Sequence, residues 1–278
     1  MKIIAESSST RTEWALVDGT TIVEHAFTTG LNPFFQSRRE ISHCIRLELP
    51  EAFFRRRWDH VYFYGAGCAN SEKNKIMESS LVAQFKSPVV VESDLLGAAR
   101  GLLVRESGLA CILGTGSNSC LYNGNEIIKN VAPLGFILGD EGSGAYIGKN
   151  LVADILKEIA PRNLCQAFYE QYMVTPNVLM DDVYTKPLAN RTLARYSAFL
   201  AEHLDNEYCY QLVYSAFMRF FTRNIAAYPY REQPLCFVGS TCMLYKDILC
   251  RAAKDFGVEI AKIKRYSMPG LIEYHKED

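Results

Sequence analysis

Three short apolar runs of this chain each lead directly into small residues, and this repeated pattern limits the folds that the chain can adopt. The segments that follow the apolar runs are 6–12 (ESSSTRT), 114–118 (GTGSN) and 239–240 (GS). Apolar runs of this length predict buried strands, and the backbone N–H groups of small residues can approach an anion closely. The pattern therefore indicates a nucleotide held between two related domains.

The same order of predicted strands and helices accompanies each of the first two segments. Two strand candidates meet at a hairpin turn in each half, at Asp18-Gly19 and at Asn123-Gly124. Together with the alternating helices and strands that follow, each half makes a β-β-β-α-β-α-β unit, and the second unit carries extra helices. The strand candidates are residues 2–5, 13–17, 21–27, 61–64 and 89–91, then 109–113, 119–122, 125–131, 235–238 and 258–263.

The two units predict an α/β protein with two lobes and a cleft. A chain of 278 residues is long enough for two domains of ordinary size. We expect a first lobe over residues 1–106, a second over 107–266, and a tail, 267–278, that packs back on the first lobe. In the second lobe, Ser143 should open a helix with Ile147, Leu151, Ile155 and Ile159 on one apolar face.

The composition excludes several classes of protein. A formal net charge of -1 gives no electrostatic reason to bind nucleic acid or an acidic membrane. No apolar stretch approaches the ~20 residues that span a bilayer, and the N-terminus does not have the pattern of a signal peptide. The nine cysteines are scattered without a C-x-x-C pair, and the five histidines have no metal-ligand spacing. We therefore expect buried thiols and a cytoplasmic protein.

The order of the motifs resembles the actin-like ATPase and sugar kinase superfamily. The segment 114–118 is followed, after twenty-one residues, by DEGS at 140–143 and later by Gly239-Ser240. Within the superfamily the chain is most similar to N-acetylglucosamine kinases, which are grouped with the benzoyl-CoA-reductase-activator type ATPases. The resemblance runs along nearly the whole chain. It implies two actin-like (ribonuclease H-like) lobes, each with a mixed five-stranded sheet, around an ATP cleft.

The resemblance also implies roles for individual residues. Phosphoryl transfer depends mainly on positioning and on neutralising the γ-phosphate. Glu6 matches the acid that holds Mg²⁺ through water, as suits a hard cation, and Asp94 matches the catalytic base. The resemblance places the sugar acceptor against Asn32, Gly65, Asn118 and Asp140, the ATP phosphates against Ser9, Thr10, Arg11, Gly114, Thr115, Gly116 and Ser117, and the adenosine against Gly239, Ser240 and Ala194.

Each of these assignments has a plainer alternative. Asp94 would serve equally as a helix cap, residues 140–143 as an ordinary N-cap region, and residues 7–12 as ordinary turn residues. As a carboxylate at a helix N-terminus, Asp94 is expected to be held ionised, and therefore to be well aimed but only a weak base.

The chain departs from the family pattern in the first hairpin. Relatives usually have Gly-Gly or Ser-Gly after the metal-holding acid, whereas this chain has Ser7-Ser8. If Ser8 needed a backbone angle that only glycine adopts cheaply, the hairpin would be strained by ~1 kcal/mol or more. Arg11 replaces the commoner lysine, and Thr241-Cys242 leave the usual adenosine pattern.

The leading hypothesis is an ATP- and Mg²⁺-dependent kinase that phosphorylates a hydroxyl of a small sugar, with an N-acetylated amino sugar such as N-acetylglucosamine as the acceptor. One alternative is an activator-type ATPase, which needs cysteines that can bind an iron–sulfur cluster, and Cys111 and Cys120 lie within predicted strands. Another is a catalytically degenerate relative that binds a sugar or nucleotide without turnover. The oligomeric state stays open, with a homodimer as one option.

Overall fold

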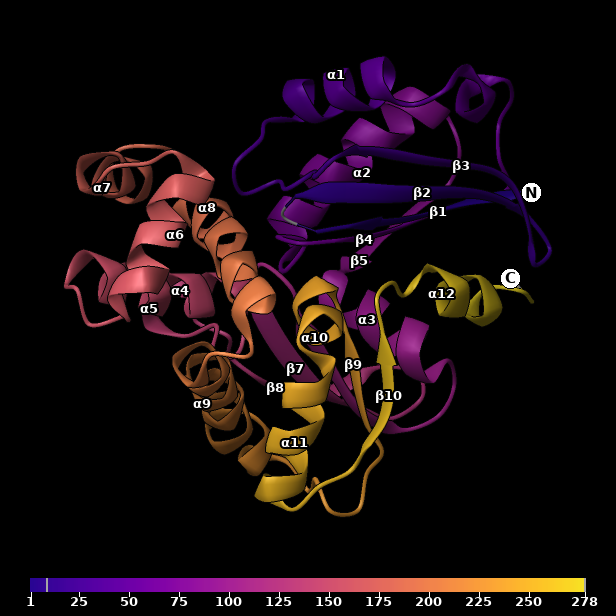
Figure 1. Cartoon of the computed structure of the whole chain (residues 1–278). Coiled ribbons are helices and arrows are strands. Elements are labelled where there is room, and N and C mark those ends of the chain that lie inside the picture. The colour runs from indigo at the N-terminus through magenta and orange to yellow at the C-terminus, as the bar shows by residue number, and fades with distance from the viewer. Residues whose placement is uncertain (9, 278) are drawn as a thin grey trace. The chain divides into compact units, whose positions relative to one another are not determined.

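The computed structural model describes residues 1–8 and 10–277, and the chain divides into two compact units. Unit 1 comprises residues 1–110, 122–128 and 266–278, and unit 2 comprises residues 111–121 and 129–265. Each end of the chain therefore belongs to unit 1, so the chain enters unit 2 and returns. The elements of both units are labelled in Figure 1.

Unit 1 is built on a mixed five-stranded sheet with the order β3-β2-β1-β4-β5. The central strand β1 pairs antiparallel with β2 and parallel with β4, because a tight turn joins β1 to β2 whereas a helix-containing crossover precedes β4. Polar turn residues at 19–20 likewise make β2 and β3 a hairpin. The strands span Lys2–Ser7 (β1), Arg11–Asp18 (β2), Thr21–Thr29 (β3), Val61–Gly65 (β4) and Val89–Ser93 (β5).

Successive residues of β1 face opposite sides of this sheet, and each side has its own apolar core. Ile3 and Ala5 pack in a cluster with residues of α1 (Arg38–Glu48) and α2 (Ser71–Phe85). Ile4 packs on the other side with residues of α12 (Met268–Tyr274), and α3 (Asp94–Leu103) contacts α12 and the sheet there. The sheet of unit 1 is therefore covered by helices on both faces, as Figure 1 shows.

The parallel strands of unit 1 end in register, which brings three predicted site segments to one edge of the sheet. Ser7 at the end of β1 pairs with Gly65 of β4, and Gly65 pairs with Ser93 of β5. Asp94 follows Ser93 as the first residue of α3. Ligands of open α/β sheets bind outside the carboxyl ends of the strands, so this edge is the natural place for a site.

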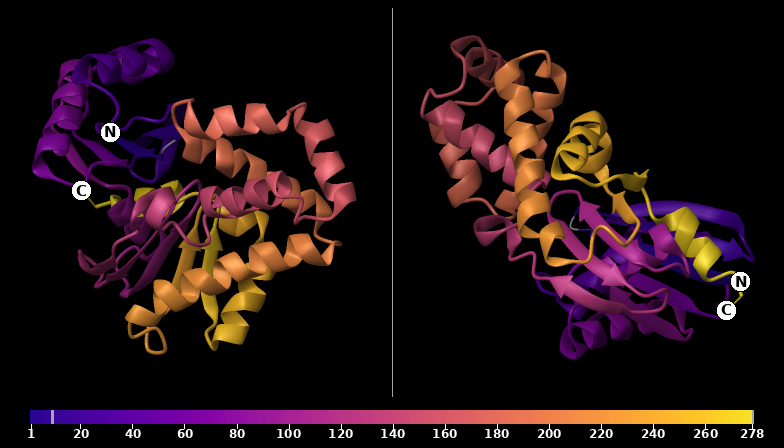
Figure 2. Two further views of the ribbon diagram at one scale, coloured as in Figure 1. Left: turned by 90° about the vertical axis from the view of Figure 1, so that its left-hand side faces the viewer. Right: turned by 90° about the horizontal axis from the view of Figure 1, so that it is seen from below.

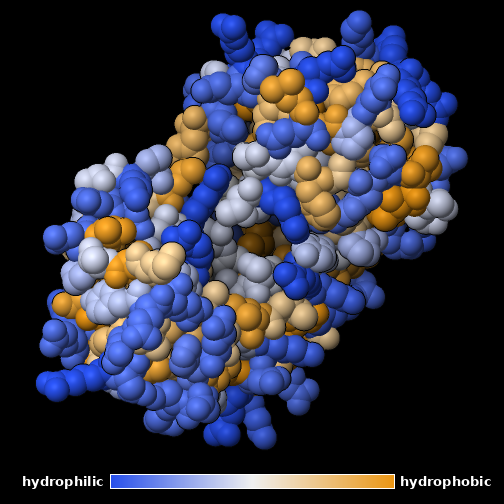
Figure 3. All heavy atoms as spheres, turned by 45° about the horizontal axis from the view of Figure 1, so that its top comes forward, coloured by the Kyte–Doolittle hydropathy of each residue, from blue (hydrophilic) through white to orange (hydrophobic). Residues whose placement is uncertain are grey.

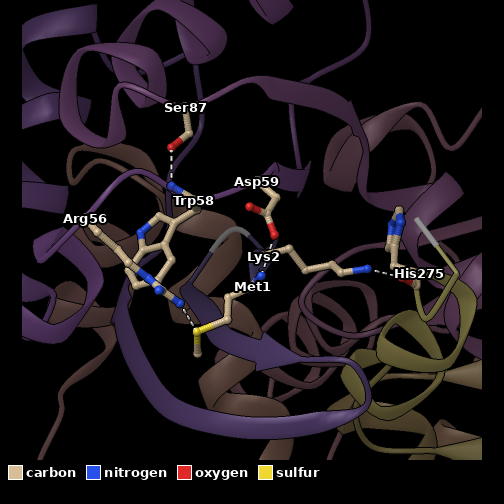
Figure 4. Close-up of polar contacts among 7 residues, drawn as sticks. All are labelled: Met1, Lys2, Arg56, Trp58, Asp59, Ser87 and His275. Carbon is tan, nitrogen blue, oxygen red and sulfur yellow. Dashed lines mark hydrogen bonds and ion pairs between the residues drawn. The ribbon is translucent and has the colours of Figure 1, made fainter.

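Both ends of the chain are fixed to unit 1 by polar contacts (Figure 4). The N-terminal ammonium group of Met1 donates to the carboxylate of Asp59, and the Lys2 ammonium donates to the backbone carbonyl of His275. The His275 ring stacks on Tyr62 with centroids 3.8 Å apart, and its Nε2 lies 2.7 Å from the Tyr64 hydroxyl. These contacts hold the segment after α12 against β1 and β4.

The second sheet is also mixed and has the order β10-β9-β6-β7-β8, with β9 and β10 parallel. Helix α9 (Glu207–Arg223) packs against α11 (Lys246–Phe256), and Figure 2 shows the two side by side. The rings of Phe220 and Phe221 on α9 contact Phe237 of β9. The strands span Gly108–Leu113 (β6), Ser117–Tyr122 (β7), Ile127–Val131 (β8), Leu235–Val238 (β9) and Ile260–Lys264 (β10).

A group of further helices belongs to unit 2 and packs mainly through aromatic side chains. Phe168 is fully buried and contacts Tyr172, Tyr196 and Phe199. Helix α5 also packs closely against α8, and this packing holds α5 in place within unit 2. The helices of this group in unit 2 are α4 (Gly135–Leu138), α5 (Gly144–Leu156), α6 (Arg162–Tyr172), α7 (Pro176–Tyr184), α8 (Ala189–Ser197), η2 (Ala198–His203), η3 (Ile225–Ala227) and α10 (Ser240–Leu244). One further short helix, η1 (Glu51–Phe54), belongs to unit 1.

The predicted α/β class, with two mixed five-stranded sheets, is confirmed. One helix boundary was wrong: Ser143 does cap α5, with its hydroxyl accepting from the Tyr146 N–H, but α5 ends at Leu156. Glu158 then adopts a positive φ of 55°, which turns the chain, and Ile159 is 61% exposed instead of lying on the apolar face.

The surface is mixed and mostly hydrophilic on the face shown in Figure 3, with hydrophobic side chains in small separate groups. Within residues 1–8 and 10–277, no helix has the length and apolar character that a transmembrane segment requires.

Candidate active site

The first hairpin, between β1 and β2, is closed by Ser8. The backbone N–H of Ser8 donates to the Arg11 carbonyl at 2.9 Å, and the Ser8 hydroxyl donates to the same carbonyl at 3.0 Å. The N–H groups of Thr10 and Arg11 in turn donate to Ser8 Oγ, each at 3.3 Å. Ser9, which was predicted to bind phosphate, lies outside the described residues.

The strain that Ser8 would suffer at a glycine-type backbone angle does not arise, because Ser8 is not among the described residues with positive φ. The turn has settled into a conformation that a residue with a β-carbon can adopt. Ser7 takes a separate, buried role: its hydroxyl lies 2.8 Å from Thr12 Oγ1, donates to the Leu31 carbonyl at 3.0 Å and accepts from the Leu31 N–H at 2.9 Å. The two serine side chains thus form hydrogen bonds within the hairpin at positions where relatives usually have glycine.

Glu6, the residue assigned to Mg²⁺, lies at the end of β1 in unit 1. Burial of its carboxyl group is the largest cause that raises its pKa to about 7, and the negative charges of Glu13 and Asp94 contribute to the same rise. The N–H and hydroxyl of Ser267 face the carboxyl group and oppose this rise, although the buried Ser267 hydroxyl has no partner in full hydrogen-bond geometry. Carboxylates that repel one another, beside an unsatisfied hydroxyl, fit a hydrated Mg²⁺ ion. No group of three or more His, Cys, Asp or Glu side chains that could hold a metal ion is found in residues 1–8 and 10–277, the surroundings of Glu6 included.

Arg11, assigned to the ATP phosphates, lies against two aromatic rings of unit 1. Its guanidinium carbon is 4.2 Å from the Phe27 ring centroid and 5.2 Å from that of Tyr266. A planar guanidinium stacks on such rings better than a lysine ammonium does, which gives a physical reason for arginine at this position.

Asp94 begins α3, but the N-cap is Ser93, whose hydroxyl accepts from the Leu96 N–H at 3.2 Å. Because Ser93 does the capping, the alternative that Asp94 is only the cap loses its support. Asp94 Oδ1 accepts from the Leu95 N–H at 2.8 Å. Burial nevertheless raises the pKa of Asp94 to about 6, so the expectation of a weak base with a low pKa was wrong. Desolvation outweighs the helix terminus and makes Asp94 a stronger base.

Asn32 and Gly65 lie on the same unit as Asp94. Asn32 Oδ1 accepts from the Phe34 N–H at 2.9 Å and so shapes its own loop. Gly67 has a φ of +81°, and a β-carbon there would lie 2.2 Å from Asn32 Oδ1. The lack of a side chain at Gly67 is what lets Asn32 occupy this position.

The second hairpin and Asp140 form one cluster in unit 2. Asp140 Oδ1 accepts from the Ser117 N–H at 3.1 Å, and a β-carbon on Gly116 would lie 3.0 Å from Asp140 Oδ2. Asp140 is 7% exposed, and burial raises its pKa to about 6. The motif at 140–143 therefore both caps α5 through Ser143 and presents a carboxylate to the hairpin.

We expect Asp140→Asn to change how stability depends on pH. The folded-state pKa of Asp140 lies above its ordinary value of 3.8, so its contribution to stability is fully present below pH 3.8 and is lost as the pH rises through about 6. Asparagine tolerates the φ of 55° and can still accept from Ser117. The free energy of unfolding of the variant should therefore gain about 2 kcal/mol over the wild type between pH 4 and pH 8, measured by urea titration. If the difference in free energy of unfolding between the two proteins stayed the same from pH 4 to pH 8, this prediction would be contradicted.

Asn118 is held by a residue that the sequence did not single out. Asn130 on β8 donates from Nδ2 to Asn118 Oδ1 at 2.9 Å and to the Ser119 carbonyl at 2.7 Å. Asn118 Oδ1 also accepts from the Ser119 N–H at 2.9 Å. The amide oxygen of Asn118 is therefore satisfied within unit 2, which leaves its amide nitrogen as the group available to a ligand.

The three residues assigned to adenosine also lie in unit 2, around the start of α5. Thr241 Oγ1 donates to the Gly114 carbonyl at 2.8 Å, and a β-carbon on Gly144 would lie 3.1 Å from the Ala194 β-carbon and 3.3 Å from Thr241 Oγ1. Gly239 has a φ of +133° and lies directly against Leu113. Thr241, seen in the sequence only as a departure, is thus a hydrogen-bonding link between the two predicted ATP segments.

The structure groups the assigned residues by unit. Unit 1 holds Glu6, Thr10, Arg11, Asn32, Gly65 and Asp94, and unit 2 holds the second hairpin, Asn118, Asp140, Ala194, Gly239 and Ser240. A sequence signal existed for Ser267 and Thr241, which are hydroxyl residues next to predicted elements. None existed for Asn130, because its partner is twelve residues away on another strand.

The comparisons with known proteins now add to this geometry. No protein-family model and no curated protein sequence matches the chain. Among solved structures, a provisionally assigned N-acetylglucosamine kinase from Porphyromonas gingivalis is 40% identical, with 100% of this chain and 99% of that chain covered and a TM-score of 0.96. A provisionally assigned N-acetylglucosamine kinase from Chromobacterium violaceum is 16% identical over 98% of each chain, with a TM-score of 0.73.

A more distant structure shares the fold alone. A ROK family glucokinase from Streptomyces griseus, in complex with glucose and AMPPNP, is 12% identical over 98% of this chain and 97% of that chain, with a TM-score of 0.54. The fold and the 40% identity along the whole chain place this protein in the actin-like ATPase and sugar kinase superfamily. Within it, the chain belongs to the N-acetylglucosamine kinase-like family.

Proposed function

We propose that this protein transfers the γ-phosphoryl group of ATP to a hydroxyl group of N-acetylglucosamine or a closely related amino sugar. The observation that carries the proposal is Asp94, a carboxylate with a pKa of about 6 at the carboxyl edge of the unit 1 sheet, in a chain 40% identical to a provisionally assigned N-acetylglucosamine kinase.

Each assigned residue has a task that its chemistry allows. Asp94 would accept the proton of the attacking sugar hydroxyl, because a base with a pKa near 6 is ionised at neutral pH yet can still take up a proton. Asp140 and the amide nitrogen of Asn118 would orient the sugar hydroxyls. Glu6 would hold Mg²⁺ through water, and the bound ion would neutralise charge on the phosphates.

The alternatives have less support. Cys111 and Cys120 are both fully buried, and burial raises the pKa of the Cys111 thiol far above its ordinary value. Iron–sulfur ligation needs accessible thiolates, so these thiols are poor ligands for a cluster. A degenerate binding protein was favoured by the Ser7-Ser8 departure, and Ser8 has no positive φ that would strain the hairpin.

The decisive experiment is an ADP-release assay over a panel of hexoses and amino sugars with Mg-ATP. We expect N-acetylglucosamine to give the highest kcat/KM, and glucose to be slower by at least about tenfold, the usual worth of one additional polar contact. Omission of Mg²⁺ should abolish ADP release. ADP release that does not depend on any sugar would favour an ATPase, and no ADP release with any sugar would contradict the proposal.

A further inference from the structure

The Ser8 hydroxyl oxygen accepts from two backbone N–H groups of the first hairpin. Its proton points to the Arg11 carbonyl, 3.0 Å away, so its lone pairs are free to accept from the N–H groups of Thr10 and Arg11. Two converging backbone N–H groups are what a phosphate oxygen requires. The hairpin therefore satisfies with its own side chain the donors that the ATP assignment needs.

This hydroxyl is not needed to form the turn. The backbone bond from the Ser8 N–H to the Arg11 carbonyl, at 2.9 Å, closes the turn by itself, and Ser7 pairs with Thr12 directly beneath it. Ser8 is exposed to solvent, so removing its hydroxyl leaves no cavity. The usual glycine of the family could not place an oxygen here.

We propose that Ser8 is an internal competitor for the ATP phosphates and so sets the affinity of the first hairpin for nucleotide. This inference rests on the proposed function. A hydroxyl attached to the hairpin has a high effective concentration at the two N–H groups, so a phosphate oxygen must displace it before it can bind them. In a variant that lacks the Ser8 hydroxyl, a water molecule would bind the two N–H groups instead. A phosphate oxygen displaces such a water more readily than a hydroxyl that is attached to the hairpin. The N···O distances of 3.3 Å are long, which keeps the hydroxyl displaceable by a charged oxygen.

The test is a calorimetric titration of Mg-ATP, and separately of adenosine, into the full chain and its Ser8 variants. Ser8→Ala and Ser8→Gly should both bind Mg-ATP about 3- to 10-fold more tightly, in line with the loss of weak neutral hydrogen bonds. Ser8→Thr keeps the hydroxyl and should bind like the wild type. Adenosine affinity should not change in any variant. Ser71→Ala, which removes another exposed serine of unit 1, is the matched control and should have no effect.

Each other outcome has one meaning. Weaker Mg-ATP binding by Ser8→Ala would show that the hydroxyl is itself a phosphate ligand, and equal binding would show that it is irrelevant; either result overturns this inference while leaving the kinase proposal intact. A change in adenosine affinity of the same size would point to a general effect on the fold and would also overturn it. Failure of the wild-type protein to bind either ligand would overturn the proposed function together with this inference.

Discussion

Asp94→Asn should lower kcat for the best sugar acceptor by ~10²–10⁴-fold, the usual contribution of a positioned general base, while the affinity for Mg-ATP changes little. The substitution is well matched, because asparagine keeps an oxygen that can accept from the Leu95 N–H, and Ser93 continues to cap the helix. The fold should therefore be preserved, which circular dichroism and thermal unfolding would verify. Single-turnover kinetics and calorimetric ATP titration measure the two effects separately.

The pH profile provides a second readout of the same role. A general base must be deprotonated, so kcat/KM of the wild-type protein should rise with pH through about 6 and then level off. Asp94→Asn should remove this rise from the remaining activity. Glu92→Gln, one strand residue before the Ser93 cap, changes a nearby carboxylate and should keep both the rate and the profile. If Asp94→Asn weakened ATP binding as much as it slowed turnover, Asp94 would have a structural role instead.

Gly239→Ala should destabilise unit 2 by about 3–5 kcal/mol and abolish measurable adenosine binding. Gly239 has a φ of +133°, a region in which side chains are strained, and a β-carbon there would lie 2.3 Å from the Leu113 carbonyl oxygen. The β-carbon is fixed to the backbone and the atom that it meets is a backbone oxygen, so neither can rotate away. Relief would require β9 to move from β6 at the point where the second hairpin begins.

Gly257→Ala is the matched control for this prediction. Gly257 also has a positive φ, +89°, but a β-carbon there would meet no atom within 4 Å. Its substitution should therefore cost only the conformational strain of about 1–2 kcal/mol and leave adenosine binding intact. Urea unfolding and calorimetry would compare the two variants. Equal stabilities would mean that the Leu113 contact relaxes without cost.

The sequence predicted the fold because its signals are local. Strands β1, β2 and β9 are apolar runs bounded by turn residues, and the Asp18-Gly19 turn alone makes β2 and β3 a hairpin. The end of α5 was misplaced, since Ile159 continues the apolar spacing although the backbone turns at Glu158. The apolar spacing shows which residues could face the core, but it does not show at which residue the helix ends.

The sequence by itself, through the order of its motifs and their resemblance to a known family, supplied the assigned residues Glu6, Asp94 and Asp140. Their acid strength was decided by the tertiary structure, because desolvation depends on every atom packed around a carboxyl group and not on its neighbours in the chain. The same holds for Ser8: the sequence showed a missing glycine and left open whether the hairpin is strained, whereas in the folded hairpin Ser8 has no positive φ and its hydroxyl accepts from the N–H groups of Thr10 and Arg11. A side chain's role follows from what its atoms contact, and contacts between distant segments exist only once the chain has folded.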